Sequence, residues 1–297
     1  MESRHPAGDG RERVTAVDTH VHIWDPRLLD YPWLRGADAL DAPFLPADFP
    51  SVRTERVVFV QADCAPAQAL DEASWVAGLA PEWPQLAGIV AGADLRSPEL
   101  EQHLDSLSEI GLVVGVRHLL QGEPVERLSE PALRRGLGAL AARGFTFDAC
   151  IQHPQLGALI ELLDRIPQLQ VVLDHLGKPP VEEGMAGDAG RRWSDGIRRL
   201  AEREGTFVKL SGLPAETADR AAYEAHAADF LAVALDAFGP ERAMLGSDWP
   251  VSARVGVGES PLAWTERVRV ATSVDAREWD LIAGETGSRF YRLSETP

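Results

Sequence analysis

Short apolar runs alternate with longer amphipathic segments along almost the whole chain. Eight of these runs are bounded by turn residues and have the length of buried strands. Helix-like segments separate most of them, so we expect the strands to pair in parallel. The predicted strands are Val14–His20, Arg56–Gln61, Leu86–Ala91, Leu112–Arg117, Thr146–Ile151, Gln170–Asp174, Thr206–Ser211 and Ala243–Ser247.

The segments between the strands carry apolar residues at helical spacing. Eight strands that alternate with helices predict an α/β fold, a (β/α)8 TIM barrel whose sheet closes on itself. The chain has neither a G-x-G-x-x-G nor a P-loop sequence, the usual signs of an open nucleotide-binding sheet. The predicted helices are Ala67–Leu79, Pro98–Glu109, Pro131–Arg143, Gln155–Arg165, Arg192–Glu204, Ala221–Phe238 and Leu262–Ser273.

The domain organisation is simple. Residues 1–13 are polar, with Gly, Pro and mixed charge, and are predicted to form a flexible N-terminal tail, whereas residues 14–297 form a single barrel domain. An irregular stretch rich in Pro, Trp and Asp, Trp24–Pro50, follows the first strand. It and the segment Lys178–Gly190 are predicted to be loops at the C-terminal face of the barrel, where active sites of this fold lie.

Acidic residues outnumber basic ones. The chain has 29 Lys and Arg against 46 Asp and Glu, a formal net charge of −17. Nucleic-acid binding needs a basic surface and is therefore disfavoured. No apolar stretch approaches the roughly 18 residues of a membrane helix, and Cys64 and Cys150 are expected to stay reduced. We expect a cytoplasmic protein that binds a small molecule and neither nucleic acid nor membrane; whether it forms a homo-oligomer stays open.

Two histidines come at the end of the first apolar run. His20 and His22 are two residues apart, so their side chains point to the same face of a strand. At the end of a barrel strand, such a pair suits a divalent metal ion or a substrate that must be polarised. The alternative is a hydrogen-bonded pair in a polar barrel mouth.

A carboxylate follows the eighth run. Asp248 lies in Gly246-Ser247-Asp248-Trp249-Pro250, where it can accept a proton from water or bind a metal ion. A turn aspartate is the alternative. If the strands close into a barrel, Asp248 faces the two histidines of the first strand.

The sixth run ends in Asp174 and His175, with Lys178 close behind. An imidazole suits contact with a carbonyl oxygen, so His175 is predicted to be catalytic. Asp174 is expected to orient a neighbouring His or Arg. Lys178 is predicted to reach the substrate, with a solvated loop lysine as the alternative.

Further substrate contacts are predicted from an arginine and two tryptophans. Arg117 ends the fourth strand, where it either binds a carboxylate or vicinal hydroxyls or pairs internally with Asp148. Trp24 and Trp249 flank the predicted mouth, and aromatic side chains stack on sugar rings, although packing is the alternative for both.

Taken together, these motifs resemble the amidohydrolase superfamily, in particular its branch of sugar lactonases, which also includes 2-pyrone-4,6-dicarboxylate lactonase. The resemblance runs from about Val14 to the C-terminus. Several motifs in the same order make it specific. The motifs that carry it are Val17–Asp25, Gly115–His118, Gln155-Leu156, Asp174–Pro179, Lys209–Gly212 and Gly246–Pro250.

The resemblance implies a lactonase that opens a sugar-derived lactone to the aldonic acid. It implies that Asp248 is the general base and that His20, His22 and Asp248 hold one divalent ion, with zinc as the first choice and a metal-free site as the alternative. The fourth strand lacks the lysine and glutamate that bridge two metals in other members of the superfamily. A related decarboxylase and a non-catalytic sugar-binding barrel are the other functions left open.

Overall fold

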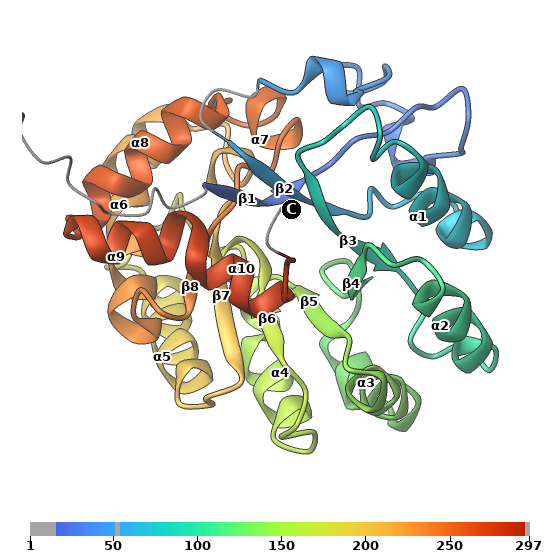
Figure 1. Cartoon of the computed structure of the whole chain (residues 1–297). Helices are drawn as coiled ribbons and strands as arrows, with labels where there is room; N and C mark the ends of the chain where they lie inside the picture. Colours follow the sequence, from blue (N-terminus) through green and yellow to red (C-terminus); the bar gives the residue numbers. More distant parts are fainter. Residues whose placement is uncertain (1–15, 51–53, 295–297) are drawn as a thin grey trace, which may run out of the picture.

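The computed structural model describes residues 16–50 and 54–294, and it confirms the predicted barrel (Figure 1). Eight strands form one sheet in sequence order, and each pairs in parallel with the next. The predicted tail over residues 1–13 lies outside the described residues. The strands are β1 Val17–Val21, β2 Arg56–Val60, β3 Leu86–Gly92, β4 Val113–Leu119, β5 Thr146–Cys150, β6 Val171–Leu173, β7 Thr206–Leu210 and β8 Ala243–Leu245.

The sheet closes between β1 and the segment after β8. Val21 forms a parallel bridge with Trp249. The backbone N–H of His22 donates to the carbonyl of Trp249 at 2.8 Å, and that of Asp248 donates to the carbonyl of His20 at 2.8 Å. Residues 227–228 positions apart in the sequence are therefore fixed side by side at the end of the barrel.

Helices surround the sheet, and the chain forms more of them than were predicted (Figure 1). The last predicted helix, Leu262–Ser273, follows the eighth strand, and three further helical segments come after it towards the C-terminus. Asp275 caps the first of these segments, and Glu278 completes a capping box. This helix-start signal is visible in the sequence, but no helix was predicted from it. The helices are α1 Ala69–Gly78, α2 Leu100–Ser108, α3 Pro131–Arg143, α4 Leu156–Leu163, α5 Asp188–Ala201, α6 Arg220–Phe238, α7 Val251–Arg254, α8 Pro261–Thr272, α9 Ala276–Asp280, a π-helical turn Leu281–Glu285 and α10 Thr286–Tyr291.

The interior of the barrel changes from apolar to polar along the strands. Residues two apart share a face, so Phe207, Lys209 and Ser211 form one row. Phe207 packs with Val172, Met244 and the aromatic side chains of α10, which covers this end of the barrel (Figure 1). Lys209 and Ser211 lie nearer the strand ends and are fully buried. The sequence thus seals one end of the barrel and places polar groups at the other.

The irregular segment after β1 packs over the strand ends. Trp24 pairs with Phe44 in an isolated antiparallel bridge, and short 3-10 turns cover Pro32–Leu34 and Pro46–Asp48. The indole N–H of Trp33 donates to the carbonyl of Ala62 at 2.7 Å, which ties this segment to the loop after β2. Within residues 16–50 and 54–294, no helix has the length and apolarity needed to cross a membrane.

Candidate active site

Three imidazoles surround one carboxylate oxygen at the ends of the strands. Oδ1 of Asp248 lies 3.4 Å from Nε2 of His22 and 3.8 Å from Nε2 of both His20 and His175. All four side chains are buried. The predicted convergence of residues from β1, β6 and β8 is therefore present in the structure.

Local backbone geometry directs these side chains inward. His20 is the last but one residue of β1 and His22 follows the strand directly, so the pleat sends both side chains to the interior. His175 lies two residues after the end of β6 and Asp248 three residues after the end of β8, and they have φ of +52° and +55°, in the left-handed region. Such conformations are uncommon for non-glycine residues and concentrate at functional sites.

Each imidazole is held through its other ring nitrogen. Nδ1 of His22 donates to the carbonyl of Val60 at 2.7 Å, so the lone pair of this ring is on Nε2. Nδ1 of His175 lies 2.9 Å from Oγ of Ser211. Nδ1 of His20 lies 3.4 Å from Oδ1 of Asp174. Outer partners of this kind fix ring orientation and tautomer in metal sites and in general acid–base sites.

Gly212 leaves room for the His175 ring. Its φ is +76°, and a Cβ at this position would lie 2.3 Å from Nδ1 of His175. A side chain here would displace the imidazole, which explains the glycine after Ser211 in the motif that ends β7.

The donor set fits a single ion. Around a tetrahedral zinc ion, with bonds of about 2.0–2.2 Å, donor atoms lie about 3.3–3.5 Å apart. The Nε2 atoms of His20 and His22 are 3.1 Å apart, and Oδ1 of Asp248 lies 3.8 Å from that of His20 and 3.4 Å from that of His22. Two nitrogens and a carboxylate oxygen are also ligands that zinc prefers. These three side chains are therefore suited to hold one metal ion.

Burial and neighbouring groups set the protonation states. Burial alone would raise the pKa of Asp248, but the nearby His175 and His22 and the hydroxyl of Ser252 outweigh it and lower that pKa below its usual value. Ser252 Oγ donates to Oδ2 of Asp248 at 2.7 Å. Burial lowers the pKa of His175 well below 6.5. At neutral pH the carboxyl is ionised and this imidazole is neutral.

Arg117 lies inside the site, but its ion pair differs from the one considered in the sequence. Its guanidinium donates to the carbonyl of Gln61 at 2.5 Å and lies 3.6 Å from Asp174. The expected internal partner, Asp148, instead contacts Lys209 at 2.5 Å. Arg117 and Asp148 lie at neighbouring positions of β4 and β5, which suggested an ion pair between them. Each instead lies closest to an opposite charge from a strand across the barrel interior.

A buried charged cluster lies beneath His20. Lys209 Nζ lies 2.5 Å from Asp148, 3.0 Å from Asp174 and 3.0 Å from Nδ1 of His20. Tyr291 of α10 donates its hydroxyl to Asp148 at 2.7 Å. The sequence indicated Asp174 as an orienting residue and placed Lys209 in one of the motifs that carry the resemblance, but it contained no sign that Tyr291 reaches this site.

A cavity of about 230 Å³ opens above the imidazoles. Its wall includes Arg117 and Lys178, which were predicted to bind substrate, and His175, which was predicted to be catalytic. Lys178 also contacts Glu216 at 2.5 Å. The wall includes several residues that were not singled out in the sequence. They are Ala62, Asp63, Leu119, Gln121, Cys150, Ala215 and Val251.

The two tryptophans predicted to bind substrate are both packed. Trp24 borders the cavity but is fully buried, and its indole N–H donates to the carbonyls of Leu40 and Ala42. Trp249 packs edge-on against Phe44 and Phe49 and is not among the residues that line the cavity. Trp33 is only partly buried and provides an aromatic surface at the cavity.

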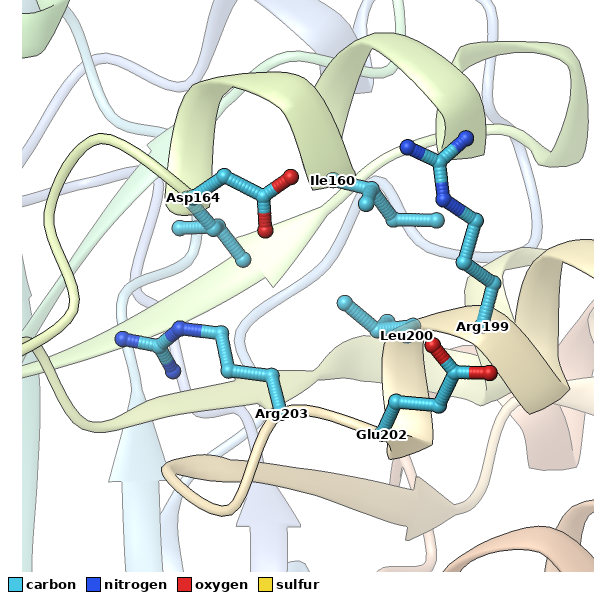
Figure 2. Close-up of a pocket in the computed structure, with 7 residues that line it drawn as sticks. Ile160, Asp164, Arg199, Leu200, Glu202 and Arg203 are labelled. Carbon is cyan, nitrogen blue, oxygen red and sulfur yellow. The ribbon is translucent and has the colours of Figure 1, made fainter.

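Another pocket lies on the outer helical layer between α4 and α5 (Figure 2). It is lined by Arg199, Arg203, Asp164 and Glu202 together with apolar side chains. None of the predicted site residues lines it, because all of them project from the carboxyl ends of the strands.

Comparison with known proteins agrees with this geometry. The family model described as amidohydrolase matches residues 17–293, nearly the whole described chain. The chain belongs to the amidohydrolase family. The match covers β1 to α10, and thus every residue of the candidate site, and it confirms the resemblance inferred from the motifs.

Three relatives are named as lactonases. The chain is 32% identical to the L-fucono-1,5-lactonase of Burkholderia multivorans, covering 94% of this chain and 96% of that protein. It is 29% identical to the L-fucono-1,5-lactonase of Burkholderia ambifaria, covering 93% and 95%. Over a shorter region, 54% of this chain and 53% of the relative, it is 27% identical to the L-rhamnono-gamma-lactonase of Scheffersomyces stipitis.

Solved amidohydrolases share the whole architecture. A crystal structure of an amidohydrolase from Burkholderia multivorans with bound zinc superposes with a TM-score of 0.82 at 31% identity, covering 94% of this chain and 99% of that one. A second crystal form, with bound HEPES, gives the same TM-score at 30% identity and the same coverage.

Proposed function

We propose that this amidohydrolase is a lactonase that hydrolyses the ring ester of a sugar-derived lactone to the aldonic acid. The observation that carries the proposal is the position of Asp248, whose Oδ1 lies within 3.8 Å of the Nε2 atoms of three imidazoles at the base of the cavity. Similarity to L-fucono-1,5-lactonases and an L-rhamnono-gamma-lactonase supports a sugar lactone as substrate.

Asp248 is the general base in this proposal. It accepts a proton from water as the water oxygen bonds to the lactone carbonyl carbon. The ring C–O bond then breaks, and the same proton passes to the leaving ring oxygen, which becomes a hydroxyl. The low pKa of Asp248 keeps its carboxylate ionised, while the Ser252 hydroxyl holds the other oxygen.

The oxygen of the lactone carbonyl gains negative charge during attack. His175 is positioned at the cavity wall to donate a hydrogen bond to it from Nε2, provided that Nδ1 accepts the hydroxyl of Ser211. Arg117 and Lys178 are proposed to bind the hydroxyl groups of the sugar. Trp33, rather than the packed Trp24 and Trp249, presents the aromatic surface for the ring.

One divalent ion, zinc as first choice, is proposed to bind to His20, His22 and Asp248. Bound zinc supplies a Lewis acid for the carbonyl oxygen and lowers the pKa of a coordinated water. The donor spacing and the zinc in the related structure support this assignment.

The proposal is tested with a panel of aldono-1,4-lactones and aldono-1,5-lactones, with acid release as the readout. The purified protein is assayed as isolated, after chelation and after return of zinc. Acid release above the buffer rate on at least one sugar lactone is expected. Absence of turnover on every lactone, with or without zinc, would contradict it.

A further inference from the structure

A second carboxylate lines the cavity in addition to that of Asp248. Asp63 lies in the loop after β2 and is exposed, whereas Asp248 is buried at the base of the cavity. Strands β2 and β6 are four apart in a closed sheet of eight, so Asp63 and Lys178 approach the cavity from opposite sides. The proton transfer proposed above does not use Asp63.

Hydrogen bonds fix the backbone that carries Asp63. The side-chain oxygen of Gln61 accepts the backbone N–H of Asp63 at 2.6 Å. The carboxyl group of the buried Glu72 accepts the backbone N–H of Ala62 at 3.2 Å, and the carbonyl of Ala62 accepts the indole N–H of Trp33 at 2.7 Å. A carboxylate on a fixed backbone is already in place for a ligand, which lowers the entropy cost of binding.

The two cations of the wall have carboxylate partners, whereas Asp63 has no such partner. Lys178 contacts Glu216 at 2.5 Å, and Arg117 lies 3.6 Å from Asp174. Among the residues that the structure describes, the Asp63 carboxylate forms neither an ion pair nor a hydrogen bond; Arg117 only opposes the rise in the pKa of Asp63 that burial causes. Both oxygens of Asp63 are therefore available to a bound molecule.

An aromatic surface lies beside this carboxylate. Trp33 lines the same cavity and binds the carbonyl of Ala62, the residue before Asp63. A carboxylate accepts hydrogen bonds from two neighbouring hydroxyl groups, and an indole packs on the C–H face of a sugar ring. A negatively charged group on the same ring would instead be repelled by Asp63.

We propose that Asp63 is a specificity-determining residue that binds hydroxyl groups of a neutral lactone and excludes lactones that carry a carboxylate on the ring. This inference rests on the proposed lactonase function and names the substrate class of the same site. It combines an attraction to one class with a repulsion of the other, and both come from a single charge.

The test uses two ligands that differ in charge. A polyhydroxylated 1,5-lactam has a ring amide that resists hydrolysis, and its analogue with a carboxylate in place of the exocyclic hydroxymethyl group carries one negative charge. Calorimetry measures the binding of each to the full-length protein. We expect the wild type to bind the neutral lactam at least about tenfold more tightly, the order expected for one pair of like charges near a protein surface.

Asp63→Asn removes the charge and keeps the shape of the side chain. The φ of Asp63 is +58°, and asparagine is among the non-glycine residues that most often adopt this left-handed conformation. We expect Asp63→Asn to bind the neutral lactam about tenfold more weakly, because hydrogen bonds to a charged group are stronger. We expect it to bind the carboxylate-bearing lactam about tenfold more tightly, since the repulsion is gone. A structural defect would weaken the binding of both ligands.

Asp94→Asn is the matched control. Asp94 is an exposed aspartate in the loop after the neighbouring strand β3, and it does not line the cavity. We expect this variant to keep the wild-type preference. An equal change of preference in Asp94→Asn would indicate a general effect of net charge and would contradict the role of Asp63.

Two further results would overturn the proposal. One is an unchanged preference in Asp63→Asn, and the other is a wild type that binds the neutral lactam no more tightly than the charged one. The wild-type comparison decides the question even if Asp63→Asn does not fold. Neither measurement needs turnover, so selective lactam binding without lactone hydrolysis would contradict only the lactonase function. Lactone hydrolysis without selective binding would contradict only the role of Asp63.

Discussion

Nε2 of His20 lies 3.1 Å from Nε2 of His22, close enough that the two nitrogens share either a proton or a cation. Because Nδ1 of His22 donates to the carbonyl of Val60, the lone pair of this ring is on Nε2. This pair of nitrogens, with Oδ1 of Asp248, is the part of the site best suited to a metal ion.

Removal of one histidine should therefore remove the metal. We expect the zinc affinity of His22→Asn to fall more than about 100-fold. Loss of an outer hydrogen-bond partner of a ligand already lowers affinity about 10–100-fold, and this substitution removes the ligand itself. Zinc content of the purified protein, measured by elemental analysis, checks this. His103→Asn is the control, since His103 lies on α2 and contacts the carbonyl of Gly92 instead. Equal zinc in both variants would contradict the assignment, and full activity after chelation would favour a metal-free site.

Substrate binding should depend on the hydrogen-bonding geometry of the Arg117 guanidinium and not only on its positive charge. Arg117→Lys keeps a cation but cannot reach the carbonyl of Gln61 and Asp174 while also contacting substrate. We expect KM for the lactone to rise about 10–100-fold, the range for loss of a hydrogen bond to a charged group. Steady-state kinetics measure it.

Arg96→Lys is the matched control for this substitution. Arg96 is also largely buried and makes a bidentate pair with Glu123, but it does not line the cavity. Its replacement should lower Tm without changing KM. An equal rise in KM in both variants would show that the effect of Arg117→Lys comes from general loss of packing.

Glu72 predicts a pH-dependent stability. It is buried on α1 and accepts the backbone N–H of Ala62 at 3.2 Å, and burial raises its pKa from 4.5 to about 7. The folded state thus favours the protonated acid, so the contribution of Glu72 to stability is complete below pH 4.5 and is lost as the pH rises through about 7.

Glu72→Gln keeps the shape of the side chain without the charge. Relative to the wild type, we expect it to be more stable at pH 8, by up to about 3 kcal/mol, and similar or slightly less stable at pH 5. Denaturant unfolding at the two pH values measures the difference. Glu101→Gln, at an exposed site on α2, should show no such trend. A pH-independent difference for Glu72→Gln would contradict the buried, raised-pKa state.

The strands were predictable because their pattern is local. Each predicted strand overlaps the observed one within a few residues; β6, for example, covers Val171–Leu173 where Gln170–Asp174 was predicted. The predicted start of the first strand at Val14 lies outside the described residues. The same locality placed His20, His22, His175 and Asp248 at strand ends, and barrel closure brings such ends together.

The rest of the site depends on contacts that no local pattern encodes. The pairing of Lys209 with Asp148, and not of Arg117, is decided by which side chains meet across the barrel interior. Trp24 and Trp249 are aromatic residues of the kind that stack on sugar rings, but the segment after β1 folds back over the strand ends and both side chains are buried. Tyr291 contacts Asp148 from a helix that follows the last strand. No pattern in the sequence shows that these two residues are close in space.

The most direct test of the central claim is the lactonase rate of Asp248→Asn. Asparagine preserves the shape at position 248 but cannot accept the proton of water. Acid release from the best sugar lactone should fall at least about a hundredfold, the lower range for loss of a general base. Asp71→Asn, at an exposed position on α1, should keep the wild-type rate. Wild-type turnover by Asp248→Asn would contradict the account.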